Sequence, residues 1–403
     1  MKINYYKRYI FITFYSLATA IILLLVSYIA TNIGVSFSGE TDIIGKSNYY
    51  LKRVISKNNP IPDSLLFVNI SYDKQLTDIY DEDGFKLGCI DITNRQSLLH
   101  FLDILSHRND YKFVTLDVRF EKGIETEYDS MLYARIASME RIAIPATHNS
   151  QTTYENSLKN KTRLSDYITT FFSNNYHKFE IERDGMESIP YFMYKSITNN
   201  KHSSYGIFHF DNGELCNRTL FTYPHIIPDG LYAQDGSRNY YNLESDLLID
   251  EEALLNDNLL ANKYIFIGDM VLNDNHETTM GNMPGCTIIA NAFISFMHRQ
   301  HVIPFTVIMI LFIIYFVFAY QIYSRKSIYA IIVEWRNKKN KKNFPIIGII
   351  LSWFTYSFTL SAVCLIFYYT CGIAYDILIT ATLIQLIDYI VAHSSHTTNL
   401  EQA

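Results

Sequence analysis

Long runs without charged side chains dominate the two ends of the chain, at residues 9–39, 302–324 and 343–374. A hydrocarbon core of about 30 Å needs roughly 20 helical residues, so each run can cross a membrane. The first run is too long to belong to a cleavable signal peptide, because the apolar region of such a peptide spans about 7 to 15 residues. These three runs and a further apolar segment near the end of the chain therefore predict four transmembrane helices, at residues 9–34, 302–323, 346–368 and 373–393.

The last predicted helix is unusual because it contains two carboxylates, Asp376 and Asp388. Acidic residues inside a membrane can mark an ion or proton path. Both lie near the ends of the segment, however, where a carboxylate can reach water. We therefore expect them to be solvated and assign them no transport role.

Basic residues indicate the orientation, because short cytoplasmic segments of membrane proteins are enriched in Lys and Arg. The segment between the second and third predicted helices holds Arg325, Lys326, Arg336, Lys338, Lys339, Lys341 and Lys342 against one acidic residue, Glu334. The N-terminus is also basic. The predicted organisation is a cytoplasmic N-terminus (1–8), an extracytoplasmic domain (35–301), a basic cytoplasmic loop (324–345) and a cytoplasmic tail (394–403).

The net charge of −6 leaves the predicted outer domain strongly acidic, because the basic residues gather in the cytoplasmic segments. Such a domain does not suit nucleic acid or anionic lipid. The basic loop could contact lipid headgroups or a cytoplasmic partner through Arg336, Lys338, Lys339, Lys341 and Lys342, although the orientation bias also explains these charges. The five cysteines lack metal-type spacing, and one disulfide is possible.

Within residues 35–301, short apolar runs alternate with helical patterns, which predicts a mainly parallel sheet with flanking helices, an α/β domain. Strands are expected at 65–70, 113–118, 141–145 and 263–268, and helices at 95–107, 129–139 and about 284–298. Residues 150–260 have a weaker pattern, with a candidate strand at 205–210 and a short helix at 190–197.

Polar residues follow three of the predicted strands. Asn69 ends the first, Asp117 and Arg119 follow the second, and a loop with Asp269, Asp274, His276 and Glu277 follows the last. The carboxyl ends of parallel strands form the edge where α/β folds bind ligands. Asn69, Asp117, Arg119, Asp269, Asp274 and His276 are therefore candidate ligand-binding residues. The alternative is that Asp269 and Asp274 form turns and cap a helix, His276 bonds to backbone, and Asp117 satisfies loop amides.

Common catalytic motifs are absent from the sequence. It contains no Gly-rich phosphate loop, no GxSxG elbow and no HExxH pair. We therefore expect no catalytic residues, no metal site and no cofactor.

The stretch 263–269, the segment 274–278, the Met283-Pro-Gly285 turn and the 290–292 Ala-Asn-Ala segment together resemble the second class of CHASE domains. Upstream, Arg95 with Leu98, Asp117 with Phe120, and Asp129 follow in the order of that family. The resemblance implies an extracytoplasmic sensor domain followed by several transmembrane helices. No kinase, cyclase or phosphodiesterase sequence follows the last helix here.

These observations predict a multi-pass protein of the inner (cytoplasmic) membrane. Its outer domain would bind an unknown small molecule or protein and relay the signal to a separate membrane or cytoplasmic partner. Two alternatives remain open: an extracytoplasmic enzyme that uses the Asp269–Glu277 loop, and a membrane scaffold without a ligand.

Overall fold

The structure is a computed structural model that describes residues 2–33, 45–47, 49–51, 61–81, 83–120, 124, 126–146, 158–170, 173–221, 225–226, 239–256, 258–271, 273–278, 281–338 and 345–400. The chain forms two compact units. Residues 45–200 and 220–299 form the α/β unit, and residues 1–44, 201–219 and 300–403 form the helical unit. Each unit is described separately.

A six-stranded parallel sheet is the centre of the α/β unit. The strand order is β15-β1-β16-β4-β5-β6. The register pairs Val68 of β1 with Ile267 of β16, and Ile267 with Leu116 of β4. The strands are β1 (Leu65–Asn69), β4 (Phe113–Leu116), β5 (Ile142–Ala146), β6 (Thr162–Leu164), β15 (Tyr241–Asn242) and β16 (Tyr264–Gly268).

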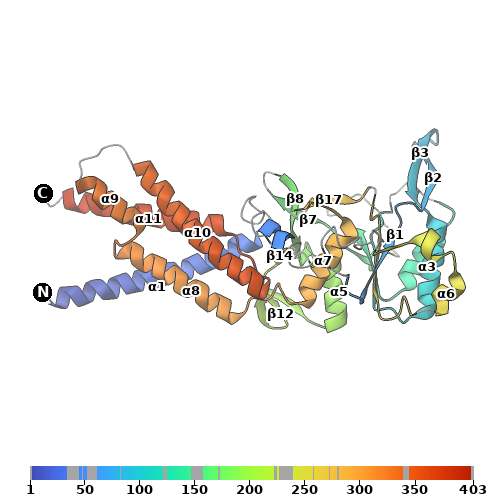
Figure 1. Cartoon of the computed structure of the whole chain (residues 1–403), viewed down its shortest axis with the longest axis horizontal. Coiled ribbons are helices and arrows are strands. Elements are labelled where there is room, and N and C mark those ends of the chain that lie inside the picture. Colours follow the sequence, from blue (N-terminus) through green and yellow to red (C-terminus); the bar gives the residue numbers. More distant parts are fainter. Residues whose placement is uncertain are drawn as a thin grey trace. The chain divides into compact units, whose positions relative to one another are not determined.

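Helices cover both faces of this sheet, because its strands are apolar on both sides. Alternate residues of β1 point to opposite faces of the sheet and contact different helices. Leu66 and Val68 face a core that includes α3 (Arg95–Arg108) and α4 (Asp129–Ser138), whereas Leu65 and Phe67 face α5 (Ile189–Thr198) and α7 (Gly285–Met297). Figure 1 shows β1 between α3 on one side and α5 and α7 on the other.

The ends of α3 follow from two asparagines. The Asn94 side chain caps the first turn by accepting from the backbone N–H groups of Gln96 and Ser97. Asn109 ends the helix in the left-handed conformation, with φ of 54°, which Asn tolerates better than most residues. The predicted helix at 95–107 is therefore confirmed within one residue.

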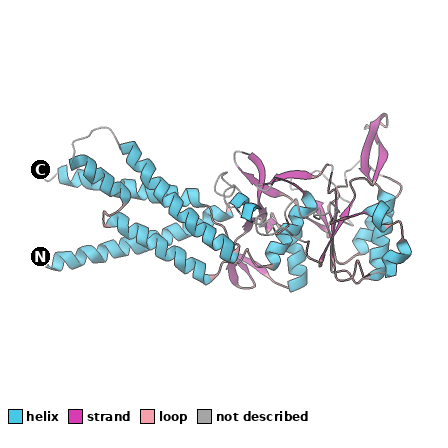
Figure 2. Cartoon of the chain, viewed as in Figure 1, coloured by secondary structure: helices cyan, strands magenta, loops and turns pink. Residues whose placement is uncertain are grey.

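Further strands and short helices complete the α/β unit. A second sheet has the order β14-β8-β17-β18, with β7 paired to β8, and a β2–β3 hairpin extends from the unit (Figure 2). The bounds are β2 (Lys74–Tyr80), β3 (Lys86–Thr93), β7 (Tyr167–Thr170), β8 (Ser173–Glu180), β9 (Glu182–Arg183), β10 (Met186–Glu187), β14 (Thr219–Phe221), β17 (Asn275–Thr278), β18 (Gly281–Pro284), the π-helix η2 (Leu243–Leu247) and α6 (Glu251–Asn256).

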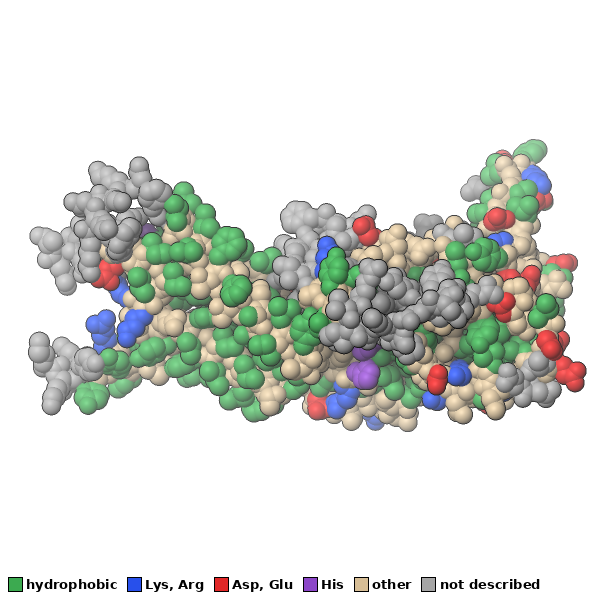
Figure 3. Space-filling model, in the orientation of Figure 1, with side chains coloured by type: hydrophobic (Ala, Val, Ile, Leu, Met, Phe, Trp, Pro, Cys, Tyr) green, Lys and Arg blue, Asp and Glu red, His purple; other side chains and the backbone are tan. Residues whose placement is uncertain are grey.

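The helical unit contains α1 (Lys2–Asn32), α8 (Phe305–Tyr323), α9 (Ile328–Lys338), α10 (Pro345–Cys371) and α11 (Ile377–Leu400). Hydrophobic side chains cover much of the visible outer surface of these helices (Figure 3). In the described part of the chain, three helices are long and apolar enough to cross a membrane, at Tyr6–Asn32, Phe305–Glu334 and Ile346–Cys371. The apolar part of α11, Ile377–His393, is shorter, and the fourth crossing stays a prediction.

The helical unit also contains a small antiparallel sheet of β11 (His202–Tyr205), β12 (Phe208–Asp211) and β13 (Glu214–Cys216). Its contacts with α1 are specific, since the Tyr28 hydroxyl donates to the Cys216 carbonyl at 3.0 Å and accepts from the His209 N–H at 3.0 Å.

Three predictions need correction. The single strand expected at 205–210 is two strands joined by a turn, in which Gly206 has a φ of +62°. The expected loop 324–345 contains the helix α9. The carboxylates of the last helix are buried rather than solvated, with Asp376 and Asp388 each 1% exposed. Asp388 accepts hydrogen bonds from Ser327 and from Tyr356 of α10, both at 2.7 Å.

A candidate ligand-binding cavity

A cavity of about 870 Å³ lies in the α/β unit at the carboxyl edge of the parallel sheet. Residues that follow β1, β4 and β16 line it, together with the first turn of α7. The remaining walls come from the β2–β3 hairpin and from β7 and β8. Volumes of about 300–1,000 Å³ are typical of small-molecule sites, so this cavity is large enough for one.

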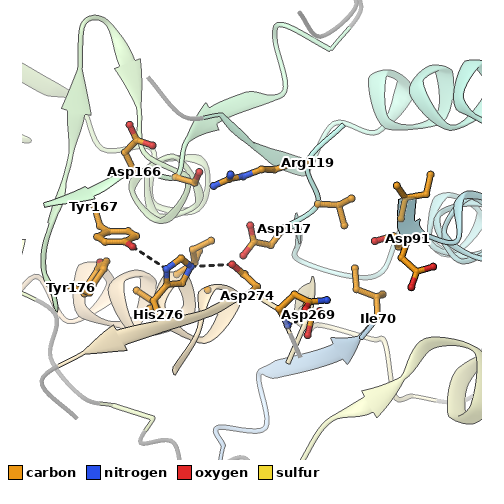
Figure 4. A pocket seen from close by; sticks show the side chains of 18 of the residues that line it. Ile70, Asp91, Asp117, Arg119, Asp166, Tyr167, Tyr176, Asp269, Asp274 and His276 are labelled. Carbon is orange, nitrogen blue, oxygen red and sulfur yellow. Dashed lines mark hydrogen bonds and ion pairs between the residues drawn. The ribbon is translucent and has the colours of Figure 1, made fainter. Parts of the chain in front are cut away.

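Two carboxyl groups converge at the start of α7 (Figure 4). Asp117 follows β4, and Asp274 lies in the loop between β16 and β17. A Cβ atom at Gly285 would clash with Asp274 Oδ2 and lie 3.0 Å from Asp117 Oδ2. Gly285 therefore gives both carboxyl groups room to approach the N-terminus of α7, where the helix dipole favours negative charge.

The pKa of Asp117 lies well above its ordinary value. Loss of solvation raises it most, and the charge of Asp274 and a hydrogen bond with Asp274 raise it further, whereas Arg119 acts in the opposite direction. Two carboxylates this close cannot both ionise easily, which favours a proton shared between them. Asp117 is therefore a proton donor toward Asp274.

A hydrogen-bonded chain leads from this pair to a tyrosine. His276 Nε2 lies 3.0 Å from Asp274 Oδ1, and His276 Nδ1 lies 3.0 Å from the Tyr167 hydroxyl. One tautomer satisfies both bonds, with Nε2–H donating to Asp274 and the tyrosine O–H donating to Nδ1. Burial raises the pKa of Tyr167, so its hydroxyl keeps its proton. The expected bonding of His276 to backbone is replaced by these side-chain contacts.

Asn69 and Asp269 have a different environment, because they hold the loop after β16. Asn69 Oδ1 accepts from the backbone N–H of Met270 at 2.9 Å, and Asn69 does not line the cavity. Asp269 accepts from the Ser71 hydroxyl and from the backbone N–H groups of Val271 and Asn273. Its carboxylate also lies 3.7 Å from Lys74 Nζ. Asp269 thus forms the turn that the structural alternative expected, although it also lines the cavity.

Positive charge reaches the same cavity from Lys74, Arg95, Arg119 and Arg183. Arg119 is exposed and forms no ion pair with any other residue that the structure describes. Arg95 is 2% exposed, and Asp129 Oδ1 lies 3.4 Å from its Nε. Within the described part of the chain, neither Nε nor Nη1 of Arg95 has a hydrogen-bond partner. A buried guanidinium normally bonds through most of its N–H groups, so Arg95 has unused donors.

The structure therefore brings five of the six predicted ligand-binding residues to one cavity: Asp117, Arg119, Asp269, Asp274 and His276. Sequence reasoning did not identify Gly285, Tyr167 or Arg95 as cavity residues. Gly285 after Pro284 at a helix start was a usable signal. Tyr167 lies in the segment with the weakest pattern and had no signal. Of the predicted partner contacts, Arg336 and Lys338 fall on the backbone of α9, and Lys339, Lys341 and Lys342 lie outside the described residues.

Among the residues that the structure describes, no group of three or more His, Cys, Asp or Glu side chains could hold a metal ion. All five cysteines are free thiols. Comparisons with protein-family models, curated proteins and solved structures found no match to this chain. The resemblance to the second class of CHASE domains thus rests on the sequence motifs alone.

Proposed function

We propose that this protein is a membrane-anchored sensor subunit that binds a small polar molecule in the cavity of its α/β unit. The observation that carries this proposal is the cavity at the carboxyl edge of the sheet, with its carboxyl pair and arginine side chains. Perturbed ionisable groups in a cleft are typical of functional sites. The cavity also favours binding over the scaffold alternative, because a scaffold without a ligand needs no cavity.

The route of the signal follows from the chain itself. Gly285, Ile288 and Ile289 in the first turns of α7 line the cavity. The same helix ends at Met297, and the candidate membrane helix begins at Phe305. A ligand that binds one arrangement of α7 more tightly than another shifts the population toward it. The proposal places the α/β unit outside the cytoplasm of the inner membrane.

The output would pass to a separate membrane or cytoplasmic protein. The basic segment with Arg336, Lys338, Lys339, Lys341 and Lys342 is the proposed contact, because clustered positive charge attracts acidic surfaces. Neutralising Lys338, Lys339, Lys341 and Lys342 should weaken capture of this partner.

A second candidate function is acid–base catalysis in the same cavity. The chain from Tyr167 through His276 and Asp274 to Asp117 favours it, since a protonated carboxyl beside an ionised one is a common acid–base pair. Turnover of a bound molecule by the purified protein would favour the enzyme over the sensor.

The test uses the full chain in lipid nanodiscs and fractions of a small-molecule cell extract. A binding fraction should raise the unfolding temperature of the wild type. Thr169→Trp fills the cavity from β7 and should abolish this rise, whereas Ser204→Trp adds the same bulk to an exposed position outside the cavity. Equal stabilisation of all three proteins, or of none, contradicts the proposal.

A further inference from the structure

The charges of the cavity divide into an acidic and a basic part. Asp117 and Asp274 form the acidic part, beside Gly285. Arg183 and Lys74 also line the cavity, but they are paired with Asp166 at 3.3 Å and Asp269 at 3.7 Å. The two members of each pair neutralise each other's charge within the walls of the cavity. The charged groups left to meet a ligand are therefore the acidic pair, the exposed Asp91 of β3, and the two arginines, Arg95 and Arg119.

Arg95 is an independent indication of a ligand. Its side chain packs over the Phe120 ring, with the guanidinium carbon 4.5 Å from the ring centroid. Burial lowers the pKa of Arg95, and the charge of Asp129 only partly offsets this. The ion pair with Asp129 involves the Nε atom of Arg95. The Nη1 atom is buried and has no hydrogen-bond partner among the described residues. Donors left in this way cost about 1–3 kcal/mol of stability, and a small turn of the Arg95 side chain toward the cavity would let a ligand carboxylate recover it.

We propose that the ligand is a small zwitterion, whose ammonium group lies between Asp117 and Asp274 and whose carboxylate contacts Arg95. The inference rests on the proposed function and names the ligand class of the same cavity. Free amino acids and short peptides share this chemistry. The cavity volume of about 870 Å³ leaves room for more than one residue.

Binding of the ammonium group should be linked to proton release. Below the raised pKa of Asp117 the free pair holds one proton, and a positively charged ligand takes the place of that proton. The titratable and charged groups that face the pair are Arg119, Tyr167, His276 and Cys286. Because Asp117 gives up its proton on binding, affinity for the ligand should increase as the pH is raised. The increase should be up to tenfold per pH unit while the pH is below the pKa of Asp117.

The experiment is isothermal titration calorimetry on the full chain in nanodiscs, in two buffers with different ionisation enthalpies. The probes are L-alanine, the dipeptide Ala-Ala, the tripeptide Ala-Ala-Ala, putrescine and succinate. We expect one or more zwitterions to bind with proton release, and putrescine and succinate to bind at least tenfold more weakly. Alanine and the two peptides distinguish an amino acid from a peptide.

Variants locate the two charged contacts. Asp117→Asn keeps a donor toward Asp274 but cannot ionise, so affinity should fall at least tenfold and proton release should disappear. Glu277→Gln is the matched control, because Glu277 is an exposed carboxylate on β17 that does not line the cavity. Arg95→Lys keeps the charge but loses the planar donors, and should weaken zwitterions while leaving putrescine unchanged. If Asp117→Asn does not fold, Asp274→Asn tests the same half of the site.

Two results would overturn the proposal that the ligand is a zwitterion. One is binding of succinate or putrescine as tight as that of every zwitterion, and the other is unchanged affinity in Asp117→Asn and Arg95→Lys. The proposed function survives either result if another small molecule stabilises the wild type and not Thr169→Trp. If no small molecule does so, both proposals fail.

Discussion

Asp117 and Asp274 come from loops that are far apart in the sequence, and both carboxyl groups meet over the missing side chain of Gly285. Gly285 N–H also donates to the Asp274 carbonyl at 2.9 Å, so the loop after β16 is fixed to the start of α7. A change in the protonation or contacts of this pair therefore acts on the start of α7, the helix that precedes the candidate membrane helix α8 in the chain.

The first prediction concerns pH. The pKa of Asp117 is raised in the folded state, so the stability linked to this group is complete below the unfolded pKa, near 4. It is lost as pH rises toward the folded pKa, by up to about 1.4 kcal/mol per pH unit. Asp117→Asn should flatten this decline in denaturant titrations at several pH values. Asp73, whose pKa burial raises to about 6, adds a similar decline, so Asp73→Asn is measured in parallel.

A second prediction follows from the space at Gly285. In Gly285→Ala the new methyl group would clash with Asp274 Oδ2, so the Asp274 carboxyl must shift from its position beside Asp117. We expect a loss of about 1–3 kcal/mol in the free energy of unfolding, together with a weaker pH dependence. Gly88→Ala is the control, because nothing lies within 4 Å of its added Cβ. Equal stability of the two variants would show that Asp274 is not constrained by the glycine.

The buried carboxylate of α11 leads to a third prediction. Asp388 accepts from Ser327 and Tyr356, and so connects three segments of the helical unit. Asp388→Ala should lower the stability of that unit by about 1 kcal/mol, the usual scale for such bonds in membranes. Asp388→Asn keeps an acceptor and should cost less. Unfolding in mixed micelles measures both, and a loss as large in the Asn variant would exclude hydrogen bonding as the role of Asp388.

Membrane topology is the fourth prediction. With the basic segment inside the cell, a cysteine at Asn340 should be protected from impermeant thiol reagents in intact cells, and one at Asn256 should react. Cys89 is exposed and Cys371 partly exposed, so both are first replaced by Ser. Reversed labelling would invert the proposed orientation.

The parallel sheet and its helices could be predicted from the sequence because their apolar runs are continuous and bounded by polar turns. The strand at 65–69 and the helix at 285–297 are examples. The hairpin β2–β3 was missed because its mostly exposed and half-buried residues give no strong alternation. The burial of Asp376 and Asp388 was also missed. For Asp388, hydropathy alone does not reveal that Ser327 and Tyr356 supply polar partners.

The candidate site could be predicted in part for a similar reason. The edge of a parallel sheet follows from strand order alone, so Asp117 and Asp274 could be placed there. The roles of Asn69 and Asp269 depend on which loop amides they meet, which sequence does not give. Tyr167 reaches His276 only through the pairing of β7 with β8, and β8 with β17.

Hydrogen exchange of the full chain in nanodiscs tests the central claim of ligand relay most directly. The account predicts that a stabilising small molecule slows amide exchange at residues 285–289 of α7 and changes exchange in the connection at 298–304. Thr169→Trp should show neither change, and Ser204→Trp should match the wild type. Protection confined to other regions, or the same protection in Thr169→Trp, would contradict the account.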